Sequence, residues 1–209
     1  MTIKNIIFDL GGVILDLDFE RMAQQFYKMG IQDFEDYFTL KKQVDFFEDL
    51  ELGQITPAEF CERLRKESKV DIDNVSIENA WNLILSDFSL ERMNFLENIS
   101  SKYKLFLFSN TNIIHAKCFE KRCFEQTGKT LDSYFDQVFY SHGLHLRKPN
   151  VVAFEKVLEH SGLQASETLF IDDNAANIAA AQKAGIQTIH LQKPQTILDL
   201  GLEQEQTYR

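Results

Sequence analysis

The sequence predicts an α/β fold, a Rossmann-like doubly wound parallel sheet with an inserted all-helical cap domain. Three observations predict it: short apolar segments recur along the chain, helical patterns lie between them, and a long block after the first segment contains no convincing strand. Strands that alternate with helices favour right-handed crossovers and a parallel sheet. The length of 209 residues is enough for one domain, with or without a substantial insert.

The predicted strands are short apolar runs. The first covers residues 3–8 and ends at Asp9, ahead of a Leu-Gly-Gly loop. Runs of this kind, without regular polar alternation, are typical of strands that are buried on both faces of a sheet. The later predicted strands are 104–109, 137–140, 168–171 and 187–191.

Two of the predicted helices follow these strands closely. Residues 149–160 place apolar side chains on one helical face, and Gly162 is a suitable stop. Residues 174–184 are rich in alanine, and Gly185 is expected to cap the end of that helix.

The block from residue 19 to residue 88 predicts several helices and no strand. Its best start signal is Thr56 as N-cap, with Pro57 at the first helical position and Glu59 closing a capping box. We therefore expect a helical cap at 17–88 and a catalytic core formed by 1–16 and 89–209, with hinges near 16–19 and 86–90. Trp81 is expected to anchor a cap helix against the core.

Composition excludes several classes of protein. Lys plus Arg number 22 and Asp plus Glu number 32, a net charge of −10 that argues against binding to nucleic acid. Apolar residues make up 44% of the chain, enough for a packed core, yet no run is long enough to span a membrane. A signal peptide is not evident, and the three cysteines lack metal-ligand spacing, so we expect a cytoplasmic protein. The oligomeric state stays open.

Polar residues gather at the predicted carboxyl ends of the strands, where ligands bind to open parallel sheets. Carboxylates that converge there repel one another, and a hard divalent cation such as Mg²⁺ relieves that repulsion. A phosphate then becomes an attractive ligand, and a carboxylate can attack phosphorus as a nucleophile. The residues predicted at this edge are Asp9, Ser109, Asn110, Lys148, Asp172 and Asp173.

Four short segments that contain these residues carry a resemblance to a known family. The chain resembles the haloacid dehalogenase superfamily of hydrolases over nearly its whole length. The segments are Phe8-Asp9-Leu10-Gly11-Gly12-Val13, Phe108-Ser109-Asn110, Arg147-Lys148-Pro149 and Phe170-Ile171-Asp172-Asp173-Asn174.

The resemblance implies a role for each of these positions. Asp9 would be the nucleophile that forms an aspartyl-phosphate. Asp173 would be the main carboxylate ligand of Mg²⁺, with Asp172 beside it, directly or through water. Ser109 and Lys148 would hold the phosphate of a small substrate, and the amide of Asn110 would add a hydrogen-bond donor.

Gly11 departs from the pattern of most phosphatases of that superfamily, which carry a second Asp at this position as general acid and base. The carbonyl of Gly11 can still face the metal, but it cannot transfer a proton. The motifs are similar to those of a subgroup that includes a bacterial α-D-glucose-1-phosphate phosphatase, which implies phosphorylated sugars as substrates. An anomeric hydroxyl leaves with less need of the roughly 10²–10⁴-fold contribution of a general acid.

Other interpretations of the same residues remain open. One is a metal-independent 2-haloacid dehalogenase, which the Asp172–Asp173 pair argues against because unscreened carboxylates would repel an acidic substrate. Another is a phosphometabolite-binding or regulatory module with low turnover. The residues expected to have structural or packing roles are Asp16, Asp18, His115, His142, His145 and Asn177, while Asp18, Arg21 and Phe47 are also candidates for contact with substrate.

Overall fold

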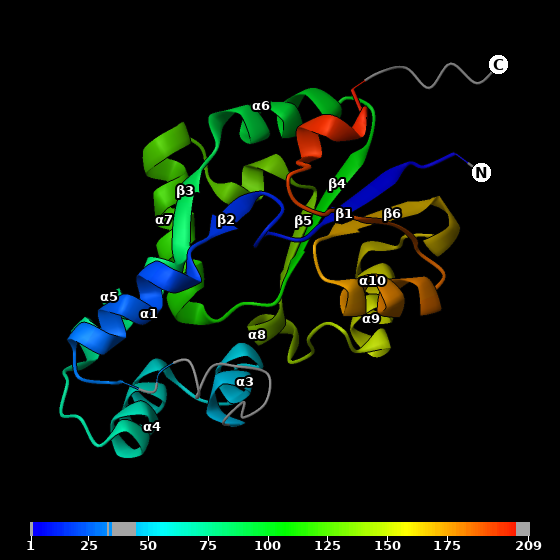
Figure 1. Cartoon of the computed structure of the whole chain (residues 1–209). Coiled ribbons are helices and arrows are strands. Elements are labelled where there is room, and N and C mark those ends of the chain that lie inside the picture. Colours follow the sequence, from blue (N-terminus) through cyan, green and yellow to red (C-terminus); the bar gives the residue numbers. More distant parts are fainter. Residues whose placement is uncertain (1, 33, 35–44, 204–209) are drawn as a thin grey trace.

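A computed structural model describes residues 2–32, 34 and 45–203 of the chain, and the statements that follow concern these residues. A five-stranded parallel sheet forms the centre of the molecule (Figure 1). Its strand order is β5-β4-β1-β6-β7. The strands are β1 (Asn5–Phe8), β4 (Lys104–Ser109), β5 (Gln137–Tyr140), β6 (Thr168–Asp172) and β7 (Gln187–His190). All five predicted strands are therefore confirmed, with small differences at some ends.

Helices cover both faces of the sheet, which confirms the doubly wound arrangement. On one face, Ile7 of β1 packs with Phe154 and Ala181, which belong to two of the helices given below. On the other face, Ile6 packs with Leu96 and Phe119, which belong to two others. Successive side chains of a strand point to opposite faces, so the unbroken apolar run of β1 is what two covering layers require. The core helices are α6 (Leu90–Ile99), α7 (Ile113–Thr127), α8 (Ser141–Leu144), α9 (Val151–Ser161) and α10 (Ala175–Lys183).

The ends of the core helices follow the predicted signals. Gly162 ends α9 in the left-handed conformation (φ 63°). Gly185 lies one residue beyond the cap of α10, also with positive φ (82°), a conformation that glycine adopts without steric cost. Four single turns of 3₁₀ helix complete the connections, η1 (Asn82–Ile84), η2 (Leu131–Tyr134), η3 (Ala165–Glu167) and η4 (Ile197–Leu200).

The inserted block lies off the carboxyl edge of the sheet (Figure 1). Its helices are α1 (Phe19–Lys28), α3 (Asp45–Glu51), α4 (Pro57–Ser68) and α5 (Asn74–Trp81), which together are called the cap below. Thr56 caps α4 through the predicted capping box with Glu59, and Pro57 occupies the first turn. The domain boundaries themselves stay a prediction.

The expectation that residues 19–88 contain no strand is wrong. Strand β3 (Leu85–Phe88) pairs antiparallel with β2 (Leu15–Leu17), and this two-stranded ribbon joins the cap to the core. Leu85 and Phe88 are buried while the Ser and Asp between them are not. A segment of four residues with two polar members has little strand propensity of its own. Its pairing with β2, whose residues lie 68 and 73 positions earlier, supplies the strand. Among the described residues, no helix is long and apolar enough to cross a membrane.

Candidate active site

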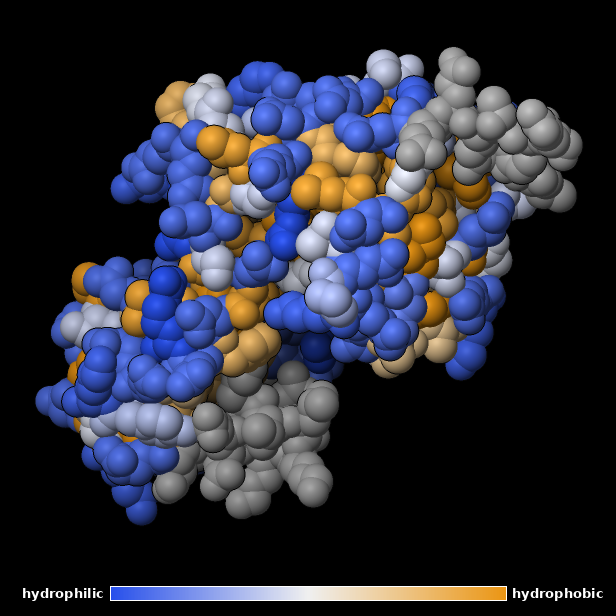
Figure 2. Space-filling model, turned by 45° about the horizontal axis from the view of Figure 1, so that its top comes forward, coloured by the Kyte–Doolittle hydropathy of each residue, from blue (hydrophilic) through white to orange (hydrophobic). Residues whose placement is uncertain are grey.

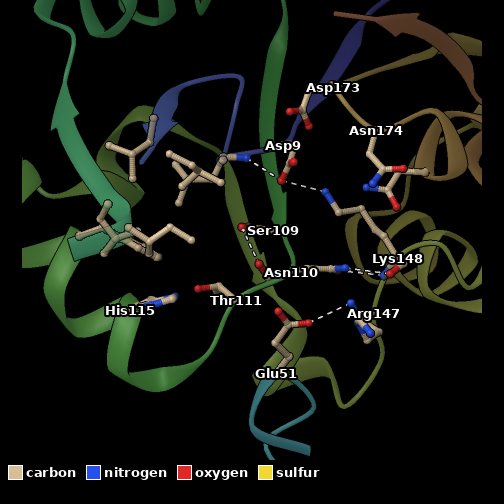
Figure 3. Close-up of a pocket in the computed structure, with 18 of the residues that line it drawn as sticks. Asp9, Glu51, Ser109, Asn110, Thr111, His115, Arg147, Lys148, Asp173 and Asn174 are labelled. Carbon is tan, nitrogen blue, oxygen red and sulfur yellow. Dashed lines mark hydrogen bonds and ion pairs between the residues drawn. The ribbon is translucent and has the colours of Figure 1, made fainter. Parts of the chain in front are cut away.

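Five of the six residues predicted at the sheet edge line one cavity (Figure 3). The sixth, Asp172, lies beside Asp9 and Asp173. Asp9 follows β1 directly, Ser109 ends β4, and Asp172 ends β6. Because β1 lies between β4 and β6, these three strand ends are neighbours at the same edge. Lys148 reaches the edge from the loop between α8 and α9.

Asp9 is a buried carboxylate with one oxygen held in place. Its Oδ1 accepts a hydrogen bond from the backbone N–H of Leu10 at 2.7 Å and forms an ion pair with Lys148 Nζ at 2.8 Å. Neither contact uses Oδ2. Burial raises the pKa of Asp9 to about 7, an effect that Lys148 opposes and the nearby Asp172 increases. A second positive charge beside Asp9 would favour its ionised form.

Lys148 is fully buried between two carboxylates. Its Nζ lies 2.8 Å from Asp9 Oδ1 and 2.8 Å from Asp172 Oδ2, and 5.3 Å from the centre of the Phe108 ring. Burial alone would lower the pKa of Lys148, but the two carboxylates outweigh burial and raise it. The ammonium group is therefore a fixed positive charge beside the candidate nucleophile.

Both oxygens of Asp172 are already hydrogen-bonded. Oδ1 accepts from the backbone N–H of Asn174 at 2.7 Å and from Asn177 Nδ2 at 3.1 Å. Oδ2 accepts from Lys148 Nζ and from Asn177 Nδ2. Asn177 thus braces the loop, as the sequence analysis expects, and Asp172 is positioned to orient Lys148.

The residues at this edge fit a divalent cation. Asp9, Asp172 and Asp173 each offer a carboxylate oxygen, and these oxygens lie within 4.8 Å of one another. Three carboxylates face one ammonium group, and Mg²⁺ prefers oxygen ligands of this kind. Burial, followed by the neighbouring Asp172, raises the pKa of Asp173. The negative charge that a cation would offset is therefore concentrated here.

Gly12 leaves room for one of these carboxylates. A Cβ atom on Gly12 would lie 2.2 Å from Asp173 Oδ2, and the φ of this glycine is +77°. Both the conformation and the space exclude a side chain at this position. The glycine therefore allows the loop after β1 to pass directly against Asp173.

Ser109 and Asn110 have different environments. Ser109 is buried on the cavity wall, and its hydroxyl has only a 3.5 Å contact with the carbonyl of Asn110. The side chain of Asn110 instead donates to the carbonyl of Lys148 at 2.8 Å and accepts from the N–H of Lys148 at 2.9 Å. Asn110 therefore fixes the loop that carries Lys148, while the Ser109 hydroxyl is available to a ligand.

Leu17 occupies the space beside Gly11. A Cβ atom on Gly11 would lie 2.8 Å from Leu17 Cδ1, the end of a flexible side chain from the ribbon. Leu17 lines the cavity at this point. An apolar side chain thus lies where a carboxyl group on residue 11 would begin.

A cavity of about 870 Å³ extends from this edge toward the cap. The molecular surface is hollowed there, with hydrophobic side chains of the cap facing hydrophilic ones of the core (Figure 2). Asp9, Ser109 and Lys148 line the polar end, while Phe47 and Trp81 contribute apolar wall. The cavity is large enough for a small phosphorylated metabolite.

Among the substrate-contact candidates, Phe47 lines the cavity, but Asp18 and Arg21 do not. Asp18 caps α1 by accepting from the N–H of Arg21, and Arg21 donates to backbone carbonyls of Leu83 and Leu85. Asp16 pairs with a core arginine, Arg92, at 3.0 Å. The two aspartates therefore have the structural roles that the sequence analysis expects.

His115 lines the cavity as a neutral packing residue. Its Nδ1 accepts from Asn112 Nδ2 at 3.1 Å, because the Asn112 oxygen already accepts two backbone N–H groups. Its Nε2 then donates to the carbonyl of Trp81 at 3.2 Å. Burial lowers the pKa of His115 to about 4. The ring stacks on Trp81, with centroids 4.9 Å apart, so Trp81 anchors α5 to the core as predicted.

Glu51 and Arg147 line the cavity, although the sequence predicts no role for either. Glu51 ends α3 in the cap, and Arg147 precedes Lys148 in the core. Arg147 Nη2 lies 3.0 Å from Glu51 Oε2, and its Nη1 lies 3.2 Å from Glu48 Oε2. No sequence signal marks Glu51, because only folding brings the end of α3 over the sheet edge.

Comparisons with known proteins show what this chain is similar to. The model of the haloacid dehalogenase-like hydrolase family matches residues 3–185. D-ribitol-5-phosphate phosphatase of Bacteroides thetaiotaomicron is 31% identical over 188 residues, 89% of this chain and 90% of that protein. Pyrimidine 5′-nucleotidase of Streptococcus pneumoniae is 28% identical, covering 90% of this chain and 84% of that protein.

A solved structure has a similar overall fold. A haloacid dehalogenase family enzyme from Bacteroides thetaiotaomicron, crystallised as a mutant with magnesium and inorganic phosphate, superposes with a TM-score of 0.89. The two chains are 34% identical, and the match covers 93% of this chain and 96% of the other.

Proposed function

Since the chain belongs to the haloacid dehalogenase-like hydrolase family, we propose that it is a Mg²⁺-dependent phosphatase of small phosphorylated sugars and polyols. The observation that carries the proposal is the placement of Asp9. One of its oxygens is fixed by Leu10 and Lys148, the other takes part in neither contact, and two further carboxylates lie beside it. This arrangement suits nucleophilic attack on a phosphate whose charge is neutralised at the same place.

Asp9 acts as the nucleophile in this proposal. An oxygen of Asp9 forms a bond to phosphorus while the bond from phosphorus to the substrate alcohol breaks. Water then attacks the aspartyl-phosphate, which releases inorganic phosphate and restores Asp9. Lys148 holds Asp9 in orientation and neutralises charge on the phosphate, and Ser109 donates a hydrogen bond to it.

Asp9, Asp173 and the carbonyl of Gly11 would hold Mg²⁺. When bound, the cation supplies positive charge that draws the phosphate toward Asp9 and stabilises the transition state. Asp172 has both oxygens hydrogen-bonded, so we assign it the orientation of Lys148 and the adjoining loop. The four hydrogen bonds that Asp172 accepts support this division of roles.

Substrates of five or six carbons fit the size of the cavity. The relative named for D-ribitol 5-phosphate supports a polyol or sugar phosphate, and the resemblance described for the sequence motifs adds glucose 1-phosphate. We therefore place both compounds in the substrate class. Because one relative is named as a pyrimidine 5′-nucleotidase, we choose a pyrimidine 5′-nucleotide as the third test compound, for comparison with the sugar and polyol phosphates.

Phosphate release from these three compounds, with and without Mg²⁺, tests the proposal. We expect hydrolysis that needs Mg²⁺ and favours the sugar and polyol phosphates. Asp9→Asn should lose activity by several orders of magnitude while circular dichroism shows an unchanged fold. Full activity in this variant, or activity that is insensitive to a chelator, would contradict the proposal.

A further inference from the structure

Because Gly11 has no carboxyl group, the leaving oxygen of the substrate has no proton donor at this position. When the bond from phosphorus to an ordinary alcohol breaks, the leaving oxygen needs a proton, and Gly11 has no group to supply it. A general acid contributes about 10²–10⁴-fold to such a step. If the chain supplies this acid, it must line the cavity within reach of the substrate's leaving oxygen.

Most ionisable side chains in the cavity wall have another proposed role or are held in hydrogen bonds or ion pairs. Asp9 is the proposed nucleophile and Asp173 a proposed metal ligand. Lys148 is held between two carboxylates, and both ring nitrogens of His115 are hydrogen-bonded. Arg147 is paired with the carboxylates of Glu48 and Glu51. Among the described residues that line the cavity, these and one further side chain, Glu51, are the ionisable ones.

Glu51 reaches the cavity from the cap side. It ends α3, and its carboxylate points into the space beneath Asn110 and Thr111, across from the end that holds Asp9 (Figure 3). The leaving group of a phosphate ester bound at Asp9 extends in the direction opposite to the attacking oxygen. A carboxyl group on the cap is therefore on the side where the leaving oxygen emerges.

The surroundings of Glu51 favour a carboxyl group that can hold a proton. Burial raises its pKa, Arg147 opposes this effect, and the neighbouring Glu48 reinforces it. Two carboxylates share the single guanidinium of Arg147, whose Nε is buried without a hydrogen-bond partner among the described residues. One proton on the pair would give this cluster a net charge of zero.

The turn that follows Glu51 is fixed against the core. The carbonyl of Leu52 lies 2.8 Å from His145 Nδ1, and the position of a Cβ on Gly53 would be 2.4 Å from the carbonyl oxygen of His142. The backbone next to Glu51 is therefore in direct contact with the core. This contact holds the carboxyl group over the cavity, as a proton donor in a preorganised site requires.

We propose that Glu51 is the general acid and base of the reaction, the role that Gly11 cannot fill because it has no side chain. In the first step the Glu51 carboxyl gives its proton to the leaving oxygen as the bond from that oxygen to phosphorus breaks. In the second step the Glu51 carboxylate takes a proton from the water that attacks the aspartyl-phosphate. The carboxyl group is thus restored after each turnover. This inference rests on the proposed phosphatase function.

Two substrates with different leaving groups separate acid catalysis from other roles. Ribitol 5-phosphate has an alkyl leaving group that needs protonation, whereas 4-nitrophenyl phosphate releases an anion that is stable without it. In Glu51→Gln we expect kcat/KM for ribitol 5-phosphate to fall about 10²–10⁴-fold, with little change for 4-nitrophenyl phosphate. A burst of nitrophenol should appear, since water attack on the aspartyl-phosphate has lost its base.

Asp49→Asn is the matched control. It removes the same charge from the same helix, but Asp49 pairs with Arg63 and does not line the cavity. Both substrates should retain their kcat/KM in this variant. A second measurement needs no variant: across a series of phosphate monoesters, kcat/KM of the unmodified enzyme should depend only weakly on the acidity of the leaving alcohol.

The possible outcomes separate the role of Glu51 from the proposed phosphatase function. Equal losses on both substrates in Glu51→Gln would assign Glu51 to binding or packing, and unchanged kcat/KM on both would remove it from the reaction. Either result overturns the inference about Glu51 without contradicting the proposed phosphatase function. A steep dependence of kcat/KM on leaving-group acidity in the unmodified enzyme would do the same. If the unmodified enzyme hydrolyses neither substrate, the proposed function itself fails.

Discussion

Two adjacent glycines shape this site, because the absence of a side chain on each leaves space for a neighbouring group. Gly12 makes room for the carboxylate of Asp173, and Gly11 for the side chain of Leu17. The two adjacent glycines thus have different consequences. A side chain at Gly12 would displace a proposed metal ligand, whereas one at Gly11 would meet only the end of a flexible leucine.

This difference makes Gly11 the position where a general acid can be restored. We expect Gly11→Asp combined with Leu17→Ala to recover part of the ribitol 5-phosphate hydrolysis that Glu51→Gln loses. The smaller alanine frees the space that the new carboxyl group needs. Steady-state kcat/KM on both test substrates checks the effect, and Leu17→Ala alone in the Glu51→Gln background is the control. Recovery by that control would show that cavity size, rather than a carboxyl group, limits the rate.

His115 gives a prediction about stability and pH. Its pKa is about 4 in the folded protein and about 6.5 when exposed. Between these values the unfolded chain binds a proton that the folded protein does not, so stability falls as the pH falls from about 6.5 to about 4. At pH 4.5 we expect this residue to account for a loss of about 2–3 kcal/mol relative to pH 7.

Urea unfolding at both pH values measures that loss. His115→Gln should lose less stability than the unmodified protein between pH 7 and pH 4.5, because its amide does not titrate. Its stability at pH 7 is itself expected to be lower, since the stacking on Trp81 is gone. Identical pH dependence in the two proteins would contradict the assignment of a buried, neutral imidazole.

At the scale of elements, the turn between α3 and α4 controls the place of Glu51. Gly53 in this turn has a φ of +66° and lies against the carbonyl of His142. Gly53→Ala should cost about 1–2 kcal/mol for the left-handed backbone, with a further 1–3 kcal/mol of overpacking expected. The clash should also move the end of α3 from the core and lower kcat/KM on ribitol 5-phosphate.

Gly128 offers the comparison for this substitution. It ends α7 with a φ of +74°, and a Cβ there would meet no atom within 4 Å. Gly128→Ala should therefore show the backbone cost without the clash, and activity should be unchanged. Similar effects of the two substitutions on both unfolding free energy and activity would show that the contact of Gly53 with the core is unimportant.

The elements also show which parts of the fold the sequence could predict. The central strands β1, β4 and β6 are visible because burial on both faces requires apolar runs. The start of α4 is visible because Thr56 and Glu59 complete a local hydrogen-bonding pattern. Strand β3 could not be predicted from the sequence, because it forms by pairing with β2, which is distant in sequence. Local signals report local interactions, and this strand has few of its own.

The same distinction applies to the site at the scale of the whole molecule. Asp9, Lys148 and the Asp172–Asp173 pair could be predicted because each lies at the end of a strand or in a short motif. The apolar wall and the Glu51–Arg147 pair could not, because they depend on how the cap lies over the core. That placement also decides which substrates fit.

Magnesium should stabilise the whole protein as well as activate it. A ligand that binds only the folded state at a hundred times its dissociation constant adds about 2.7 kcal/mol to the free energy of unfolding. We expect thermal unfolding to shift upward on addition of Mg²⁺ and downward with a chelator, in parallel with activity. Asp173→Asn should reduce both effects, and an undiminished thermal shift in this variant would place the cation elsewhere.

Because β2 and β3 pair with each other, the cap could be replaced by another segment without changing the core. Leu15 and Leu17 pair with Phe88 and Leu85, so the chain leaves the core and returns to it at adjacent positions. A short hairpin turn could join the two strands without disturbing the order of the central sheet. Exchange, shortening or enlargement of the segment between them would change the choice of substrate and would remove or move Glu51, while Asp9, Lys148 and Asp173 would keep their places in the core.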